Sequence, residues 1–442
     1  MRQISRREFL RYVGAGTAAI IGRSAIPFSV GKGPLQASTV VQCFDETATS
    51  ENTVNESVVQ IMMDESVKAL TGMNDVGEAW KSLFPGITQN NVVSIKVNCI
   101  NSLTPTNPEL VNCIVNGLAQ MELNGHHFKR NNIIIWDRTD SELRNAGYTV
   151  YDEDDPDTVR CFGTNHPGVG RDSDCRLDVD YSGGTYTKYP SMILSQMSDY
   201  LINAAVLKNH GDAIVTLGMK NHYGSVDQPP GGQLHYTTCN PSIPSLCQQL
   251  RDVVTPHEKE RIVIIDALWG SVIRGPGGAP NCNPKKVIMS TDIVACDSQG
   301  QNIINEERTR LGYSTVNAPH ITTAPEPPYN LGTTEIDLVE ISNPTGIEES
   351  HITRLSNTAL SVSPNPFRTQ TTITLSVSHT SFVYLDLVDS SGRLQESVFQ
   401  GQLPRGDHRL PYRTQKRLPS GTYFLRFHGH GSTHVSKVTV LN

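Results

Sequence analysis

The chain has 442 residues and a formal net charge of −7, and its length favours two folded units over one. The charge is unevenly spread, because residues 38–355 carry −17 whereas residues 1–37 and 356–442 carry +5 each. An acidic body of this kind repels phosphate backbones, so we expect no nucleic acid among the partners. It suits a cationic ligand or a metal ion, or it serves solubility alone.

The first 37 residues are typical of an export signal. Residues 5–10 read Ser-Arg-Arg-Glu-Phe-Leu, and residues 12–21 form a short apolar stretch diluted by glycine and threonine. A helix that spans a membrane needs about 20 apolar residues, which is about twice this length. The paired arginines indicate a twin-arginine signal, with an ordinary secretory signal as the alternative. We therefore expect residues 1–37 to bring the folded chain to the twin-arginine translocase and into the periplasm.

The nine cysteines all lie in the middle of the chain, and none forms a Cys-x-x-Cys pair. The sequence therefore contains no iron–sulfur cysteine motif and no zinc ribbon. In an oxidising compartment we expect disulfides, with Cys161–Cys175 and Cys239–Cys247 as candidate pairs. An odd number of cysteines leaves at least one thiol unpaired within the chain.

Predicted strands and helices alternate through residues 38–341. Short apolar runs predict strands at residues 92–97, 133–136, 201–207, 262–265 and 287–289. Helical periodicity and capping patterns predict helices at residues 53–72, 76–84, 107–122, 141–147, 242–254 and 295–311. This alternation is typical of an α/β domain that has a mainly parallel sheet with flanking helices.

The C-terminal part of the chain has a different pattern. Ile373, Leu375 and Val377 alternate with polar neighbours, and similar alternations follow without any helical period. This pattern predicts a small all-β sandwich at residues 360–442. The stretch at residues 342–359 is predicted to be the linker.

Polar side chains follow the predicted strands of the α/β domain. These side chains are Lys96, Asn98, Asp137, Arg138, Lys208, His210, Asp266, Ser290 and Asp292. Ligands of open α/β sheets bind at the carboxyl ends of the strands, so we expect these groups to converge on one rim. Asp and Asn also end strands as turn formers or helix caps, which is the alternative for each of them.

Three histidines and two lysines gather in a segment with glycine-rich turns. They are Lys208, His210, Lys220, His222 and His235. Neutral imidazoles and carboxylates can hold a divalent metal ion, which is the one cofactor that the sequence suggests. The candidate ligands of such an ion are Asp137, His210, His222, Asp266 and Asp292. Alternatively, the lysines bind a phosphate or a carboxylate.

Several motifs of the α/β domain resemble domain-of-unknown-function family 362 (DUF362) over roughly residues 40–320. They are Val93-Ser-Ile-Lys-Val-Asn98, Trp136-Asp-Arg-Thr139, Val206-Leu-Lys-Asn-His210, Gly218-Met-Lys-Asn-His-Tyr-Gly224 and Ser290-Thr-Asp-Ile-Val-Ala-Cys-Asp297. Some members of the family carry ferredoxin-like cysteine clusters, which this sequence lacks. The resemblance implies no particular reaction, but it favours Lys96, Asn98, His210, Lys220 and Asn221 as site residues.

The C-terminal residues are similar to the sorting domain of type IX (Por) secretion. The motifs that carry this similarity are Ser363-Pro-Asn-Pro-Phe367, Asp389-Ser-Ser-Gly-Arg393, Leu418-Pro-Ser-Gly-Thr-Tyr-Phe424 and Val438-Thr-Val440. The resemblance implies that the type IX machinery moves the chain from the periplasm to the cell surface or the extracellular space. An immunoglobulin-like module without a sorting role is the alternative.

The sequence favours an exported enzyme that binds a metal ion or an anion and an unidentified small molecule. We expect Lys96, His210 and Lys220 to be catalytic. The residues expected to bind the ligand are Asn98, Lys208, Asn221 and Tyr223. Two alternatives are a redox protein whose cofactor is loaded before export and a cell-surface binding protein without catalysis.

Overall fold

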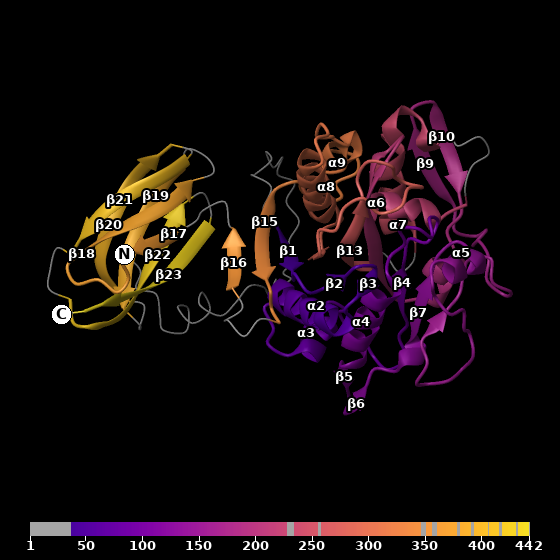
Figure 1. Cartoon of the computed structure of the whole chain (residues 1–442), viewed down its shortest axis with the longest axis horizontal. Helices are drawn as coiled ribbons and strands as arrows, with labels where there is room; N and C mark the ends of the chain where they lie inside the picture. The colour runs from indigo at the N-terminus through magenta and orange to yellow at the C-terminus, as the bar shows by residue number, and fades with distance from the viewer. Residues whose placement is uncertain are drawn as a thin grey trace, which may run out of the picture. The chain divides into compact units, whose positions relative to one another are not determined.

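The computed structural model describes residues 37–227, 234–254, 258–345, 351–355, 360–377, 381–389, 393–404, 406–414, 418–429 and 432–441. The described chain divides into two compact units, of which the first ends at Arg354 and the second begins at Leu355 (Figure 1). The predicted export signal lies outside the described residues, apart from its last position. None of the helices in the described ranges is long and apolar enough to cross a membrane.

The first unit is built on a ten-stranded sheet. Its strands are β1 (Ser38–Phe44), β4 (Val93–Lys96), β7 (Ile133–Trp136), β8 (Arg160–Cys161), β11 (Tyr200–His210), β12 (Ile214–Thr216), β13 (Glu260–Ser271), β14 (Lys286–Ser290), β15 (Ile336–Ser342) and β16 (His351–Leu355). Their order is β16-β15-β1-β14-β13-β11-β4-β7-β8, and β12 pairs with β11. β16 falls within the range that the sequence predicts as the linker.

The sheet is mixed and mostly parallel, which confirms the α/β class. β7, β4, β11 and β13 run in the same direction, whereas β14 is antiparallel to both β13 and β1. Ser290 at the end of β14 therefore pairs with Val263 near the start of β13. The carboxyl ends of β4, β7 and β11 meet at one edge of the sheet, and the carboxyl end of β14 lies at the other.

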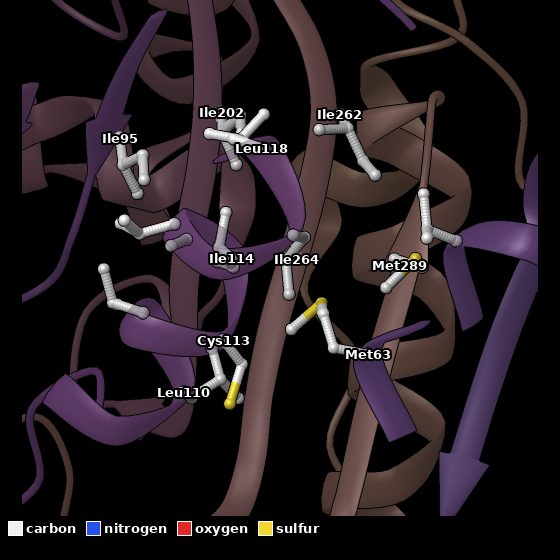
Figure 2. Close-up of a cluster of buried hydrophobic side chains, with 14 of the residues drawn as sticks. Met63, Ile95, Leu110, Cys113, Ile114, Leu118, Ile202, Ile262, Ile264 and Met289 are labelled. Carbon is white, nitrogen blue, oxygen red and sulfur yellow. The ribbon is translucent and has the colours of Figure 1, made fainter. Parts of the chain in front are cut away.

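Helices cover both faces of this sheet. They are α2 (Glu56–Thr71), α3 (Val76–Ser82), α4 (Pro108–Ala119), α5 (Asp140–Asn145), α6 (Gly218–Asn221), α7 (Ser242–Val253), α8 (Ile293–Arg310) and α9 (Pro319–Thr323). Met63 of α2 and Ile114 of α4 pack with Ile264 of β13 in one buried cluster (Figure 2). Leu246 of α7 and the next strand residue, Ile265, belong to a second cluster. Because successive residues of a strand point to opposite faces, the two clusters lie on opposite sides of the sheet.

Shorter elements connect these layers. The two-residue strands and the hairpin strands are β2 (Thr49–Ser50), β3 (Thr53–Val54), β5 (Glu122–Leu123), β6 (His126–His127), β9 (Leu177–Tyr181) and β10 (Gly184–Lys188). Single helical turns occur as η1 (Arg130–Asn132), η2 (Ile193–Met197), η3 (His222–Gly224) and η5 (Thr237–Cys239). Among them, η3 continues directly from α6 and contributes to the candidate site.

The second unit contains two small antiparallel sheets. Their strands are β17 (Leu360–Ser363), β18 (Gln370–Val377), β19 (Ser381–Asp389), β20 (Leu394–Leu403), β21 (Gly406–Arg413), β22 (Gly421–Gly429) and β23 (Ser432–Val440). The orders are β17-β18-β21 and β20-β19-β22-β23. Alternate residues, such as Ile373 of the first sheet and Leu385 of the second, share one buried cluster. The alternating pattern therefore predicts the β structure of this unit correctly.

All nine cysteines are free thiols, so neither predicted disulfide is present. Cys161 packs in the cluster on one face of the sheet, whereas Cys175 packs against the cluster on the other face. The thiol of Cys247 points to the carbonyl oxygen of Met219, at 3.6 Å, instead of to Cys239. The sheet thus separates Cys161 from Cys175, whereas Cys239 and Cys247 lie in one cluster with both thiols unbridged.

Candidate functional site

A cavity of about 130 Å³ lies at the carboxyl ends of β4, β7 and β11. The polar residues and the glycine that line it are Lys96, Asn98, Asp137, Arg138, Lys208, His210, Thr216, Lys220, Asn221, Tyr223, Gly224 and His235. The three strands supply their last residues and the residues that follow, while α6 and η3 supply residues 220–224. The strand-end pattern and the histidine–lysine segment therefore meet in one place.

A buried ion pair joins the ends of β4 and β7. The Lys96 Nζ lies 2.8 Å from Asp137 Oδ1 and also donates a hydrogen bond to the carbonyl oxygen of Val97. The other Asp137 oxygen accepts a hydrogen bond of 2.6 Å from the Cys99 backbone N–H, and Oδ1 accepts one from the Arg138 backbone N–H. Asp137 is thus already held by a cation and two backbone donors, so it serves as the counter-ion of Lys96.

A chain of amides extends from this pair to Lys208. The Lys208 Nζ donates to Asn98 Oδ1 at 2.7 Å and to the Thr104 carbonyl oxygen at 3.0 Å. The amide nitrogen of Asn98 donates to Asn221 Oδ1 at 3.1 Å, and the Asn221 amide donates to Asn203. Burial lowers the pKa of Lys208 to about 8, because its hydrogen-bond acceptors are neutral oxygens that offset only part of the lost hydration. Lys208 is therefore rigidly placed but not neutralised.

Lys220 is the least satisfied charge of the cavity. Lys220 is 8% exposed, and its Nζ atom lies 3.8 Å from the centre of the Tyr223 ring. The Tyr223 hydroxyl donates to the Leu234 carbonyl oxygen at 2.6 Å, which fixes the ring beneath the ammonium. Within the described part of the chain, the Lys220 ammonium has no hydrogen bond and no ion pair. Burial lowers its pKa to about 8, since a buried charge without a counter-charge is costly.

Two histidines form the wall beside Lys220. The Nδ1 atom of His210 accepts hydrogen bonds from the backbone N–H groups of Asp212 and Ala213 at 3.0 and 3.1 Å. This places the ring proton on Nε2, so His210 is a hydrogen-bond donor at that atom. Burial, followed by the charge of Lys220, lowers the pKa of His210 to about 3. The ring stacks on His235 with the centroids 5.5 Å apart.

The residues present do not suit the divalent metal ion that the sequence suggests. Ligand atoms of His210, Asp212 and His235 lie within 4.8 Å of one another. However, a metal bound at His210 Nε2 requires the proton on Nδ1, where two backbone N–H groups already point. The unpaired Lys220 cation lines the same cavity and repels a second cation. The geometry favours an anion over a metal ion.

Two of the predicted metal ligands lie away from this cavity. Asp266 is fully buried in β13 and accepts hydrogen bonds from the backbone N–H groups of Asn107 and Leu268, and burial raises its pKa to about 6. Asp292 caps α8 by accepting from the backbone N–H groups of Val294 and Ala295. The sequence prediction that Asp292 lies at the same edge of the sheet is wrong, because β14 is antiparallel to β13 and ends at the opposite edge.

His222 also points elsewhere, although it lies between two lining residues. Its Nε2 atom is 2.5 Å from Glu260 Oε2, and its Nδ1 atom is 3.2 Å from the Ser225 hydroxyl. Both ring nitrogen atoms of His222 therefore have partners. His222 and Glu260 line a separate cavity of about 410 Å³. Adjacent residues of a helical turn face different directions, so a shared motif does not place His222 beside Lys220.

Two features of the site have no clear sign in the sequence. Gly224 is the point where the chain touches the ion pair: a Cβ atom there would lie 2.9 Å from Lys96 Nζ and 3.1 Å from Asp137 Oδ1. Its place at the end of the 218–224 motif is the one available signal. His320 is fully buried in α9, and burial followed by the charge of Lys220 lowers its pKa to about 3. His320 is not among the residues that line the cavity, and no sequence pattern links it to Lys220.

Residues 93–302 match the family model described as "Domain of unknown function (DUF362)". This match covers 210 of the 442 residues, all within the α/β unit. Lys96, Asn98, His210, Lys220 and Asn221 all fall within the matched residues and line the cavity. No curated protein matches the chain.

Two solved structures are similar to parts of the chain at low identity. Dimeric latent PorU from Porphyromonas gingivalis is 18% identical with a TM-score of 0.17, and the match covers 21% of this chain and 11% of PorU. A protein from Thermotoga maritima is 8% identical with a TM-score of 0.34, and the match covers 60% of each chain. The chain thus covers less than two thirds of the length of either structure.

Proposed function

We propose that the DUF362 domain is an enzyme that binds a small anionic substrate in the cavity at the carboxyl ends of β4, β7 and β11. The observation that carries this proposal is the Lys220 ammonium, which is buried against Tyr223 without a hydrogen bond or ion pair within the described residues. A bound anion would supply the missing counter-charge. Hydrogen bonds to ionised groups are among the strongest that a protein makes.

The charge balance of the cavity supports an anion. Asp137 neutralises Lys96, and Arg138 forms an ion pair with Glu142. The acceptors of Lys208 are neutral, so Lys208 and Lys220 leave the cavity positive. This local charge opposes the acidic character of the surrounding chain, whose residues 38–355 carry −17.

The size of the cavity indicates which part of a substrate enters it. Its volume of about 130 Å³ is below the roughly 300 Å³ at which typical ligand pockets begin. A carboxylate or phosphate group with a few attached atoms fits this space. His210 Nε2–H would donate a hydrogen bond to the substrate, and the Lys208 ammonium, which Asn98 holds in place, would be the charge that positions it.

Calorimetric titration of the full chain with inorganic phosphate and with acetate tests the anion site. We expect binding by the wild-type protein and an affinity at least about tenfold weaker in Lys220→Met, which is about 1.4 kcal/mol. Lys129→Met removes an exposed positive charge and should leave the affinity unchanged. Equal binding by the wild type and Lys220→Met would refute the site. Anion binding without turnover of any small acid would favour the non-catalytic binding protein.

We also propose that the chain is exported by the twin-arginine translocase and then delivered by the type IX machinery to the surface or outside. The support is the Arg6-Arg7 motif and the order of the motifs at residues 363–440. Replacing both arginines by lysine should keep the protein in the cytoplasm of the native host. Removing residues 360–442 should stop it in the periplasm. Fractionation with an antibody measures both, and an unchanged distribution of either variant contradicts that step.

A further inference from the structure

The surroundings of the Lys220 ε-amino group suit a nucleophile as well as an anion-binding cation. It is buried, it has no hydrogen bond or ion pair within the described residues, and it lines an open cavity. We propose that Lys220 forms an imine with a small carbonyl compound that also carries an anionic group, such as a 2-oxo acid. This inference rests on the proposed anion site and names the substrate class for it.

The lysines of the cavity differ in what they can do. Lys96 is tied to a carboxylate at 2.8 Å, and Lys208 is held by two oxygens at 2.7 and 3.0 Å. Neither amine is available for attack without breaking these bonds. Among the described residues, the ammonium of Lys220 contacts the face of the Tyr223 ring and makes no hydrogen bond or ion pair. Lys208 therefore suits the anionic group of the substrate, and Lys220 suits its carbonyl carbon.

The surroundings of Lys220 favour its neutral form more than water does. Burial lowers its pKa to about 8, so a larger fraction of the amine is unprotonated near neutral pH than for a free lysine. Desolvation and neighbouring cations are the usual means by which proteins activate an amine. The Tyr223 ring would then stabilise the positive charge of the product, because an aromatic face attracts an iminium ion as it attracts an ammonium ion.

The covalent step needs no oxidant, reductant or second substrate. The neutral Lys220 amine attacks the carbonyl carbon, a C–N bond forms, and the carbonyl oxygen takes up a proton while the nitrogen loses one. The resulting carbinolamine loses its hydroxyl group as water when it is protonated, and the C=N bond forms as a protonated imine. His210 lines the same cavity, and its Nε2–H group, with Nδ1 occupied as an acceptor, would donate a hydrogen bond to the oxygen of the carbonyl group.

Borohydride trapping with pyruvate tests the imine on the full chain. Pyruvate is incubated with the folded protein, sodium cyanoborohydride reduces any imine to a stable amine, and peptide mapping by mass spectrometry locates the adduct. We expect one adduct per chain, on Lys220, and competition by acetate. Lys220→Arg keeps the positive charge, so it should keep anion binding by calorimetry and lose the adduct. Circular dichroism of the variant controls for folding.

The outcomes distinguish the imine from the anion site. An adduct on Lys220 that acetate suppresses supports the imine. Adducts on Lys208, or only on exposed lysines such as Lys129, overturn it. Anion binding without any adduct overturns the imine and leaves the anion site standing, whereas neither binding nor adduct overturns both. If Lys220→Arg does not fold, the mapped position of the wild-type adduct still decides.

Discussion

At the scale of single residues, the burial of the charged Lys220 side chain lowers the free energy of unfolding. Its pKa is lowered from 10.5 to about 8, chiefly by burial and also by the cations Arg138 and Lys96, while the Asp212 carboxylate opposes the shift. Between these two pH values the unfolded chain binds more protons than the folded chain does. The free energy of unfolding therefore increases as the pH rises from about 8 to about 10.5, because the unfavourable contribution of charged Lys220 to folding disappears.

Replacing Lys220 by Met should consequently stabilise the protein at pH 7. We expect a gain of about 1–3 kcal/mol, because the pKa shift corresponds to about 3 kcal/mol and the Tyr223 ring offsets part of the cost. The gain should shrink towards zero near pH 10.5. Urea unfolding at pH 7 and pH 10 measures it, with Lys129→Met as the control that should show no difference at either pH. A destabilised Lys220→Met protein at pH 7 would contradict this account.

The Lys96–Asp137 pair leads to the opposite prediction. Replacing Asp137 by Asn leaves a cation whose side chain is 1% exposed without its counter-ion, so we expect a loss of about 3–5 kcal/mol in the free energy of unfolding. Glu78→Gln breaks the exposed pair with Lys81 and should cost no more than about 1 kcal/mol. Urea unfolding of both variants compares them. Similar losses in the two would show that burial does not set the strength of the pair.

Sequence reasoning predicted the cavity residues well where a strand end determined their position. Lys96, Asp137 and Lys208 meet because β4, β7 and β11 are parallel neighbours. It placed Asp292 and His222 wrongly beside them, because their positions depend on a strand direction and on the turn of a short helix. Both are properties of the folded chain that the order of residues does not reveal.

At the scale of elements, the α6–η3 segment determines the shape of the cavity. Its N-terminus is held by Asp297, whose carboxylate accepts hydrogen bonds from the backbone N–H groups of Gly218 and Met219 at 2.7 and 2.9 Å. Burial raises the pKa of Asp297 to about 7. From this anchor the segment carries Lys220 and Asn221 into the cavity and ends against the Lys96–Asp137 pair at Gly224.

Gly224→Ala should therefore disrupt the site. The added Cβ atom would lie 2.9 Å from Lys96 Nζ, so either the lysine or the turn must move. We expect a loss of about 1–3 kcal/mol in stability and weaker phosphate binding by calorimetry. Gly211→Ala is the matched control, since nothing lies within 4 Å of its added Cβ atom. If both variants behave like the wild type, the close approach at residue 224 has no role.

Most helices and strands of the first unit were predictable from periodicity, because their apolar faces cover a sheet that is buried on both sides. The predicted helix at residues 53–72 begins only at Glu56, since Thr53–Val54 forms β3 and pairs with Thr49–Ser50. The predicted strand at residues 287–289 exists as β14, but its direction came from pairing with β13. A local sequence pattern determines whether a segment forms a helix or a strand, but it does not determine which strands pair or in which direction.

At the scale of the whole molecule, the chain has separate hydrophobic cores in its two units. Ile264 belongs to a core of the first unit and Leu385 to that of the second, and both are fully buried. The change in alternation near residue 360 predicted this division, because strands of a small antiparallel sheet have one buried face. The destinations implied by the two ends of the chain stay predictions.

Separate cores predict two transitions in differential scanning calorimetry of the full chain. Ile264→Ala and Leu385→Ala each create a cavity that costs about 2–5 kcal/mol. We expect each substitution to lower the midpoint of one transition, a different one for each variant. Phosphate should raise the midpoint of the transition that Ile264→Ala affects. A single transition that both substitutions shift equally would mean that the units unfold together.

The course of residues 220–222 links the two cavities of the first unit. Lys220 lines the smaller cavity and His222 lines the larger one. The buried Asn203 side chain lies between them, accepting from Asn221 at 2.9 Å and contacting His222 Nε2 at 3.2 Å. One turn of backbone thus contributes a wall to each of the two cavities. A substitution that shifts this turn is therefore expected to change the walls of both cavities.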